Sequence, residues 1–125
     1  MTLDELSLKQ AEKLHDEAIL FLVEAILAKH EKKYNDEKTF KEKAFNKELA
    51  AAKLLEDTEI EPSRAILFRS AANLALIIGR FNDCVNLCDV GLNSKITHNW
   101  IKNELINLKE RANKLIEGSK NDNLT

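Results

Sequence analysis

Glu12 and His15 form a Glu-x-x-His sequence, a spacing that carboxylate-bridged di-iron proteins use to aim both side chains at one metal. Such a site needs this sequence twice, together with two further glutamates. Neither His30 nor His98 follows a glutamate at the same spacing. We therefore expect no metal site and interpret Glu12 and His15 as part of an exposed, charged helical turn.

Cys84 and Cys88 stand four residues apart, which places both thiols on one face of a helix. The two could act as a redox pair or supply half of a zinc site. A zinc site would need two further ligands, and His98 alone does not complete it. A reduced cysteine behaves as a small hydrophobic residue, so we predict that both pack in the core. Two cysteines so close together argue against a disulfide framework and favour the reducing cytoplasm.

The sequence lacks the signatures of an enzyme. It contains no nucleophile motif, glycine-rich phosphate loop or HExxH sequence, and we expect no catalytic residue and no cofactor. The net charge is −2, and residues 31–57 hold seven basic and seven acidic residues, which argues against a nucleic-acid surface. The apolar stretch 18–28 is interrupted by Glu24 and is shorter than the roughly 20 residues of a membrane-spanning helix. The acidic N-terminus differs from a signal peptide, so the expected location is cytoplasmic.

Three glycines and one proline in 125 residues leave few turns, which predicts an all-α fold of about five helices. The first expected helix starts near Ser7, where Ser7 and Gln10 form a capping box. The other four cover residues 36–56, 62–78, 82–90 and 98–118. Asn35 is the expected N-cap of the second helix and Thr97 that of the last. Gly79 is expected in a turn, whereas Gly91 and Gly118 are expected to end helices. Residues 1–118 then form a single domain and residues 119–125 a flexible tail.

The first helix carries an apolar stripe at helical spacing, which we expect to be its core face. Its members are Leu14, Ala18, Phe21, Leu22, Ala25 and Ile26. The third helix is apolar nearly all round from Ala71 to Ile78, and this predicts a buried, central position.

Residues 62–92 resemble a tetratricopeptide repeat (TPR), a unit of two antiparallel helices. The matching residues are Phe68, Ala71, Ala72 and Ala75 in the first helix, Gly79-Arg80-Phe81 at the turn, Cys84, Cys88 and Gly91 in the second helix, and Pro62 at the preceding closing position. A weaker copy lies upstream, with Tyr34 as the turn aromatic and Lys33 in place of the turn glycine. The helix from Trp100 resembles the terminal capping helix of such arrays.

The resemblance implies a TPR-like scaffold that binds a protein or peptide through the concave face of its first helices. The residues at the matching groove positions are Arg69, Asn73, Asn103 and Asn107 for hydrogen bonds and Leu22 and Ile26 for apolar contact. Both helical and extended ligands remain open. The alternatives are a structural module that self-associates, for example as a homodimer, and a small helical enzyme.

Overall fold

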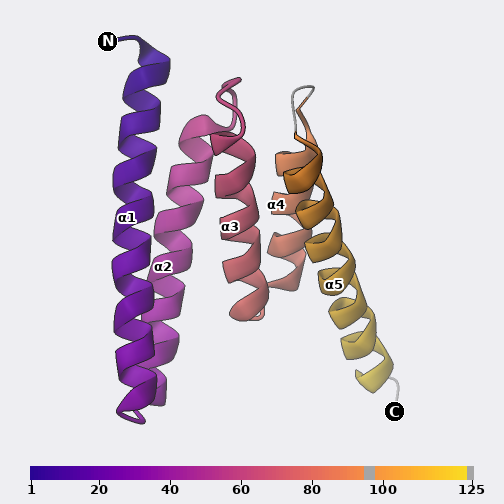
Figure 1. Ribbon diagram of the computed structural model, residues 1–125. Helices are drawn as coiled ribbons and strands as arrows, with labels where there is room; N and C mark the ends of the chain where they lie inside the picture. The colour runs from indigo at the N-terminus through magenta and orange to yellow at the C-terminus, as the bar shows by residue number, and fades with distance from the viewer. Residues whose placement is uncertain (95–97, 124–125) are drawn as a thin grey trace. The chain divides into compact units, whose positions relative to one another are not determined.

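The computed structural model describes residues 1–94 and 98–123, which form five α-helices and contain no strand (Figure 1). The helices are α1 (Leu3–His30), α2 (Tyr34–Leu55), α3 (Ser63–Ile77), α4 (Phe81–Leu92) and α5 (Asn99–Asn123). The predicted all-α class is confirmed. The chain clusters into two compact units, Met1–Ile60 with α1 and α2, and Glu61–Thr125 with α3 to α5.

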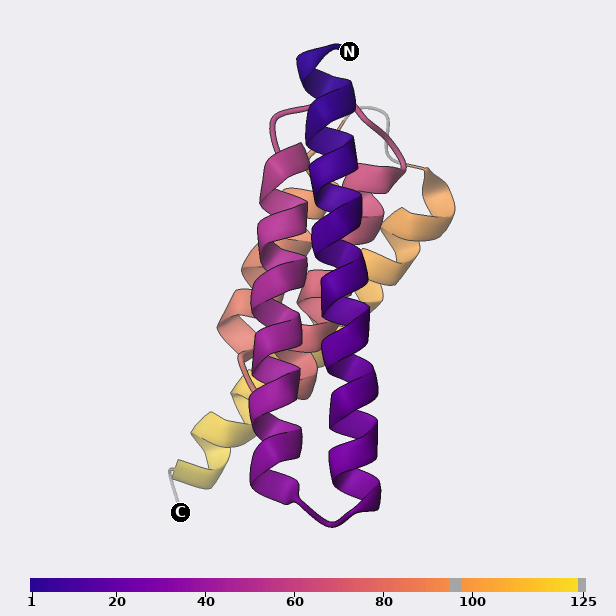
Figure 2. The same ribbon diagram turned by 90° about the vertical axis from the view of Figure 1, so that its left-hand side faces the viewer.

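Helices α1 and α2 form an antiparallel hairpin (Figure 2). The buried side chains of α1 are all alanines, and they recur at intervals of seven, seven and three residues, at Ala11, Ala18, Ala25 and Ala28. This spacing puts them on one face of the helix. Because alanine is small, α2 can approach this face closely and bury Phe45 and Leu55 beside it.

The predicted core stripe of α1 is partly wrong. Ala18 and Ala25 are buried, but Leu14, Phe21 and Leu22 are only half-buried, and Ile26 is exposed. The segment from Ala18 to Ala28 is apolar around much of its circumference. Its pattern therefore does not fix which face packs, and the alanine face allows the closer approach.

Helix α1 begins earlier than predicted, because Thr2 and Glu5 form its capping box. The Glu5 backbone N–H donates to Thr2 Oγ1 at 3.1 Å, and the Thr2 N–H donates to Glu5 Oε2 at 3.3 Å. Ser7, the predicted cap, lies inside the helix. No glycine or proline separates the two candidate boxes, so the helix extends back to the first.

A Schellman turn closes α1, with Lys32 in the left-handed conformation at φ 61°. The Lys32 N–H donates to the Lys29 carbonyl at 3.0 Å, and the Lys33 N–H donates to the Ala28 carbonyl at 2.8 Å. The left-handed position of this turn is therefore occupied by Lys32, one residue before Lys33. Helix α2 starts at once with Tyr34, so Asn35 lies inside it and is not its N-cap.

The turn between α3 and α4 has the same geometry. Gly79 has φ 84°. Its N–H donates to the Leu76 carbonyl at 3.2 Å, and the Arg80 N–H donates to the Ala75 carbonyl at 2.8 Å. The C-cap angles agree closely (φ −83°, ψ 4° at Glu31; φ −88°, ψ 6° at Ile78). The prediction that Gly79 forms the turn is confirmed, and Phe81, predicted in the turn, begins α4 as Tyr34 begins α2.

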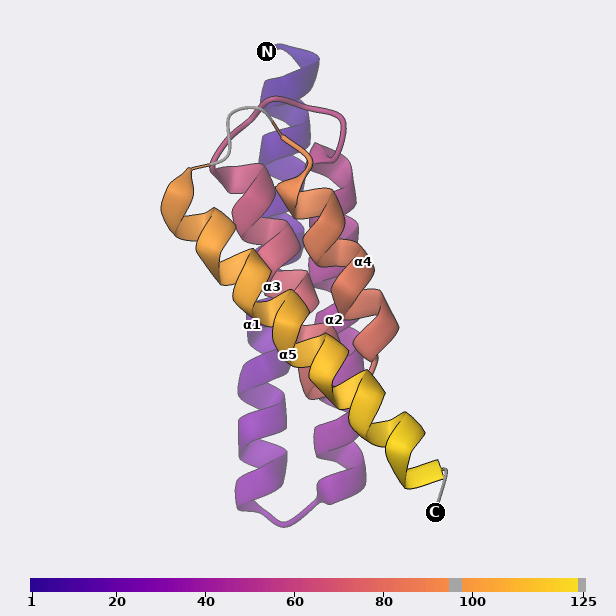
Figure 3. The ribbon, with the colours of Figure 1, turned by 90° about the vertical axis from the view of Figure 1, so that its right-hand side faces the viewer.

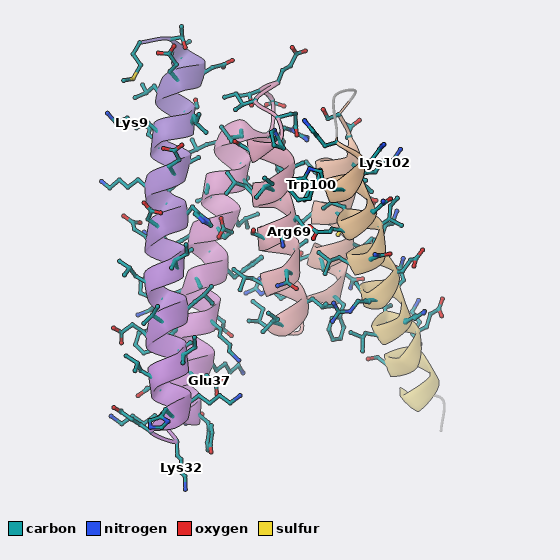
Figure 4. All side chains as sticks on the ribbon, in the orientation of Figure 1. Lys9, Lys32, Glu37, Arg69, Trp100 and Lys102 are labelled. Carbon is teal, nitrogen blue, oxygen red and sulfur yellow. The ribbon has the colours of Figure 1, made fainter. Side chains whose placement is uncertain are left out.

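Replacing Lys32 with glycine is expected to stabilise the α1–α2 hairpin by about 1 kcal/mol, since a left-handed conformation costs an L-residue roughly 1–2 kcal/mol. Lys32 lies at the exposed tip of the hairpin (Figure 4), so the change disturbs no packing. Urea unfolding followed by circular dichroism measures the effect. Lys32→Ala is the control, because it also removes the charge but keeps the side-chain penalty. Equal stability of the two variants would contradict the conformational argument.

In the second unit, α5 runs obliquely across α3 and α4 (Figure 3). The three helices share a core in which the largest fully buried side chains are Phe68, Ile101, Leu105, Cys84 and Cys88. Most residues of α3 are buried, including Ala71, Ala72 and Ala75. The predicted burial of α3 is thus confirmed.

Gly91 does not end a helix as predicted but lies buried inside α4, which continues to Leu92. A Cβ atom at Gly91 would come within 3.1 Å of both Phe68 Cβ and Leu105 Cδ1. The absence of a side chain therefore allows α4 to approach α3 and α5 closely. Glycine serves here for helix contact and not for a left-handed cap.

The end of α5 also differs from the prediction. The helix continues through Gly118 to Asn123, and Gly118 does not adopt a positive φ. A glycine lowers helix stability by roughly 1 kcal/mol relative to alanine, which does not suffice to end a helix. Most of the predicted tail, residues 119–123, is thus helical backbone. Thr97, the predicted cap of this helix, lies outside the described residues.

A buried arginine, Arg64, connects the start of α3 to the end of α4. Its Nη2 donates to the Val90 carbonyl at 2.7 Å, and its Nη1 donates to the Gly91 carbonyl at 3.4 Å. Nη1 also lies 3.5 Å from Glu61 Oε1, and the guanidinium stacks 5.3 Å from the Phe68 ring centre. Arg64 thus supplies side-chain donors to two carbonyls at the C-terminus of α4, one of which, that of Val90, also accepts the Asn93 N–H at 3.1 Å.

Candidate functional site

A polar hollow of about 240 Å³ lies between α3 and α5 in the second unit. Its lining residues are Arg69, Asn73, Glu104, Asn107, Leu108 and Arg111. Each helix contributes residues three or four positions apart, so the hollow is formed by one face of each. Figure 4 labels Arg69 on α3.

The hollow carries a net positive charge, with two arginines and one glutamate. Arg69 Nε lies 3.4 Å from Glu104 Oε2, within reach of ionic attraction. Among the described residues, however, this buried Nε finds no hydrogen-bond acceptor in good geometry. The amides of Asn73 and Asn107 line the same space. The hollow thus offers more hydrogen-bond donors than its single carboxylate satisfies, which suits an anionic group.

Three of the four predicted polar groove residues, Arg69, Asn73 and Asn107, line this hollow. The fourth, Asn103, is exposed on α5 and is not among the lining residues. The sequence interpretation missed Glu104, Leu108 and Arg111. Glu104 lies three positions before Asn107, Arg111 lies four positions after it, and Leu108 lies four positions after Glu104, so helical spacing could have found them.

Leu22 and Ile26, the predicted apolar contacts, lie on α1 in the other compact unit. Leu22 is half-buried and Ile26 is exposed. Their part in a groove stays a prediction.

His15 lies next to Glu48 of α2 rather than acting with Glu12. Its Nδ1 is 2.8 Å from Glu48 Oε1 and 2.9 Å from Oε2, and Glu48 is buried. Glu12 is exposed. The interpretation of His15 as part of an exposed turn is therefore wrong, because a partner 33 residues away half-buries it. In the part of the chain that the structure describes, no three His, Cys, Asp or Glu side chains gather as a metal site requires.

Cys84 and Cys88 are free, fully buried thiols on the core side of α4. A hydrogen bond between the two thiols, together with burial, raises the pKa of Cys88 above its usual range. A neutral, buried thiol is a poor nucleophile and a good small core residue. The predicted packing of both cysteines in the core is confirmed.

Many charges of the lysine-rich α1–α2 hairpin have local partners. Lys33 pairs with Glu31, Lys41 with Glu37, and Lys47 with Glu17 of α1, each at 3.0 Å or less. Lys43 lies 5.7 Å from the centres of the stacked Phe21 and Phe40 rings. These pairings leave fewer free cations for a polyanion.

No family model, curated protein or solved structure matches the chain. Among the described helices, none combines the length and apolar character needed to cross a membrane.

Proposed function

We propose that this protein is a non-enzymatic protein-binding module, and that the hollow between α3 and α5 receives an acidic group of a partner polypeptide. The observation that carries the proposal is the buried Arg69 Nε, which lacks a well-oriented acceptor among the described residues. Asn73, Asn107 and Arg111 surround the same space with further donors. A carboxylate entering there would replace Glu104 as the ionic partner of Arg69 and would accept a hydrogen bond from its Nε.

The proposal includes a TPR-like architecture. It is supported by the two hairpin turns, which share one Schellman geometry and an aromatic residue at the start of the following helix. It is also supported by small residues where α4 packs, namely Cys84, Cys88 and Gly91. The two free thiols suit a reducing compartment, and we propose the cytoplasm as the location.

Arg69→Ala is expected to weaken binding of an acidic peptide at least tenfold, because it removes the half-buried cation of the hollow. The probe is a library of short random peptides, each with a free C-terminal carboxylate or a C-terminal amide. The full chain selects from the library, and fluorescence anisotropy then measures the selected peptides. The selected peptides should have a free C-terminus or be rich in Asp and Glu.

The matched control is Arg80→Ala, since Arg80 is exposed on the α3–α4 turn, outside the hollow. It should leave peptide affinity within about twofold of the unmodified chain. Equal losses of peptide affinity in both variants would show that binding depends on the net charge of the chain and not on the hollow, and would contradict the proposed site. Selection of no acidic or carboxylate-bearing peptide would refute the proposed site.

A further inference from the structure

Helix α1 has a second apolar face that its hairpin partner does not cover. Five large apolar side chains on it are 44–68% exposed. They are Ile19, Leu20, Val23, Ile26 and Leu27, which we call the outer stripe. Intervals of one, three, three and one residues place them on one side of the helix. The alanines that pack against α2 lie on a different face.

The outer stripe has the area that a symmetric dimer needs. Five such side chains, about half exposed, present on the order of 450 Å² of apolar surface, a size at which patches on monomers are commonly functional. A standard interface buries about 800 Å² per partner, and roughly 65% of a homodimer interface is apolar. The stripe and its polar margin together match that requirement.

The polar groups at the two ends of the outer stripe can pair with each other, since an imidazole can donate a hydrogen bond to a carboxylate. Glu12 and Asp16 precede it on the same face, and His30 follows it. In an antiparallel pairing of two α1 helices about Val23, Asp16 of one copy faces His30 of the other. Ile19 then faces Leu27, and Leu20 faces Ile26. A parallel pairing would place Asp16 against Asp16, which disfavours it.

We propose that the chain forms a homodimer in which two outer stripes pack antiparallel about a two-fold axis at Val23. One surface then meets its own copy, as closed two-fold symmetry requires. The apolar side chains supply the association energy, and the Asp16–His30 pairs fix the register. This dimer does not depend on the α3–α5 hollow, so either proposal can fail alone.

Val23→Glu tests the dimer, because it places two like charges on the two-fold axis. Sedimentation equilibrium of the full chain between about 1 and 200 μM should show a dimer that this change weakens at least 100-fold. Leu115→Glu is the matched control, since Leu115 is equally exposed but lies on α5, and it should leave the dimer intact. Ile26→Lys is a second variant of the stripe. Circular dichroism verifies that each variant is folded.

The register is tested by exchanging the polar groups at the two ends of the stripe. His30→Asp alone should weaken the dimer, because it sets two carboxylates opposite each other, and adding Asp16→Lys should recover at least tenfold of the loss. A double variant no tighter than the single one would overturn the antiparallel register. An unmodified chain that stays monomeric up to 200 μM would overturn the dimer, as would equal sensitivity to Leu115→Glu.

Discussion

Arg64→Ala is expected to lower the free energy of unfolding of the α3–α5 unit by about 3 kcal/mol. The substitution removes the guanidinium donors from the Gly91 carbonyl and from the Val90 carbonyl, which keeps the Asn93 N–H. It also removes the cation beside the buried Glu61 carboxylate and the contact with the Phe68 ring. A buried charge or carbonyl deprived of its partner bears the desolvation cost alone, which makes this loss large for one residue.

Trp100 is the only tryptophan and lies in the same unit, so its fluorescence in urea measures this loss. Arg64→Lys should lose about half as much, because it keeps the charge but lacks the second arm of the guanidinium. Arg80→Ala, at an exposed arginine, should change stability by less than about 0.5 kcal/mol. If Arg64→Ala were as mild as Arg80→Ala, the contacts of Arg64 with α4 would contribute little.

Gly91→Val is expected to destabilise the same unit by about 3 kcal/mol through overpacking. The first atom of any side chain at Gly91 would come within 3.1 Å of Phe68 Cβ. That atom is fixed to the α3 backbone, so relief requires the two helices to separate. Gly91→Ala should lose about 1 kcal/mol, because its gain in helix propensity offsets part of the strain.

Gly118→Ala is the matched control for Gly91, since an added Cβ there meets nothing within 4 Å. It should be neutral or stabilising by up to about 1 kcal/mol. Urea unfolding followed by Trp100 fluorescence compares all three variants. A stabilising effect of Gly91→Ala as large as that of Gly118→Ala would show that α3 and α5 yield easily at this contact.

The number and type of the helices could be predicted from the sequence, but several ends could not. Ser7 and Gln10 have the spacing of a capping box, and so do Thr2 and Glu5, the pair that forms it. Local pattern alone cannot choose between two adequate caps when no helix breaker separates them. Gly91 was equally ambiguous, because glycine both ends helices and allows two helices to touch.

The candidate site was partly predictable because a single helix carries several of its residues. Arg69, Asn73 and Asn107 were predicted from the family resemblance, and all three line the hollow. Glu104 and Arg111 share the face of Asn107 by helical spacing, but they were missed because α5 carries many other charged residues and the sequence does not show which face of α5 meets α3. The His15–Glu48 pair was missed for a different reason: its partners lie on two helices, and the register of the hairpin brings them together.

By itself, the sequence determined an all-α chain, the glycine turn at Gly79 and the burial of α3 and its neighbouring cysteines, because periodicity and backbone propensity are local properties. Only the tertiary structure decided which face of α1 packs, why Gly91 is required, and that Arg64 reaches the end of α4. These features depend on how closely two helices approach, and that distance is set by side chains far apart in the sequence. The outer stripe follows from the same cause, since packing on the alanine face left the larger side chains of α1 exposed.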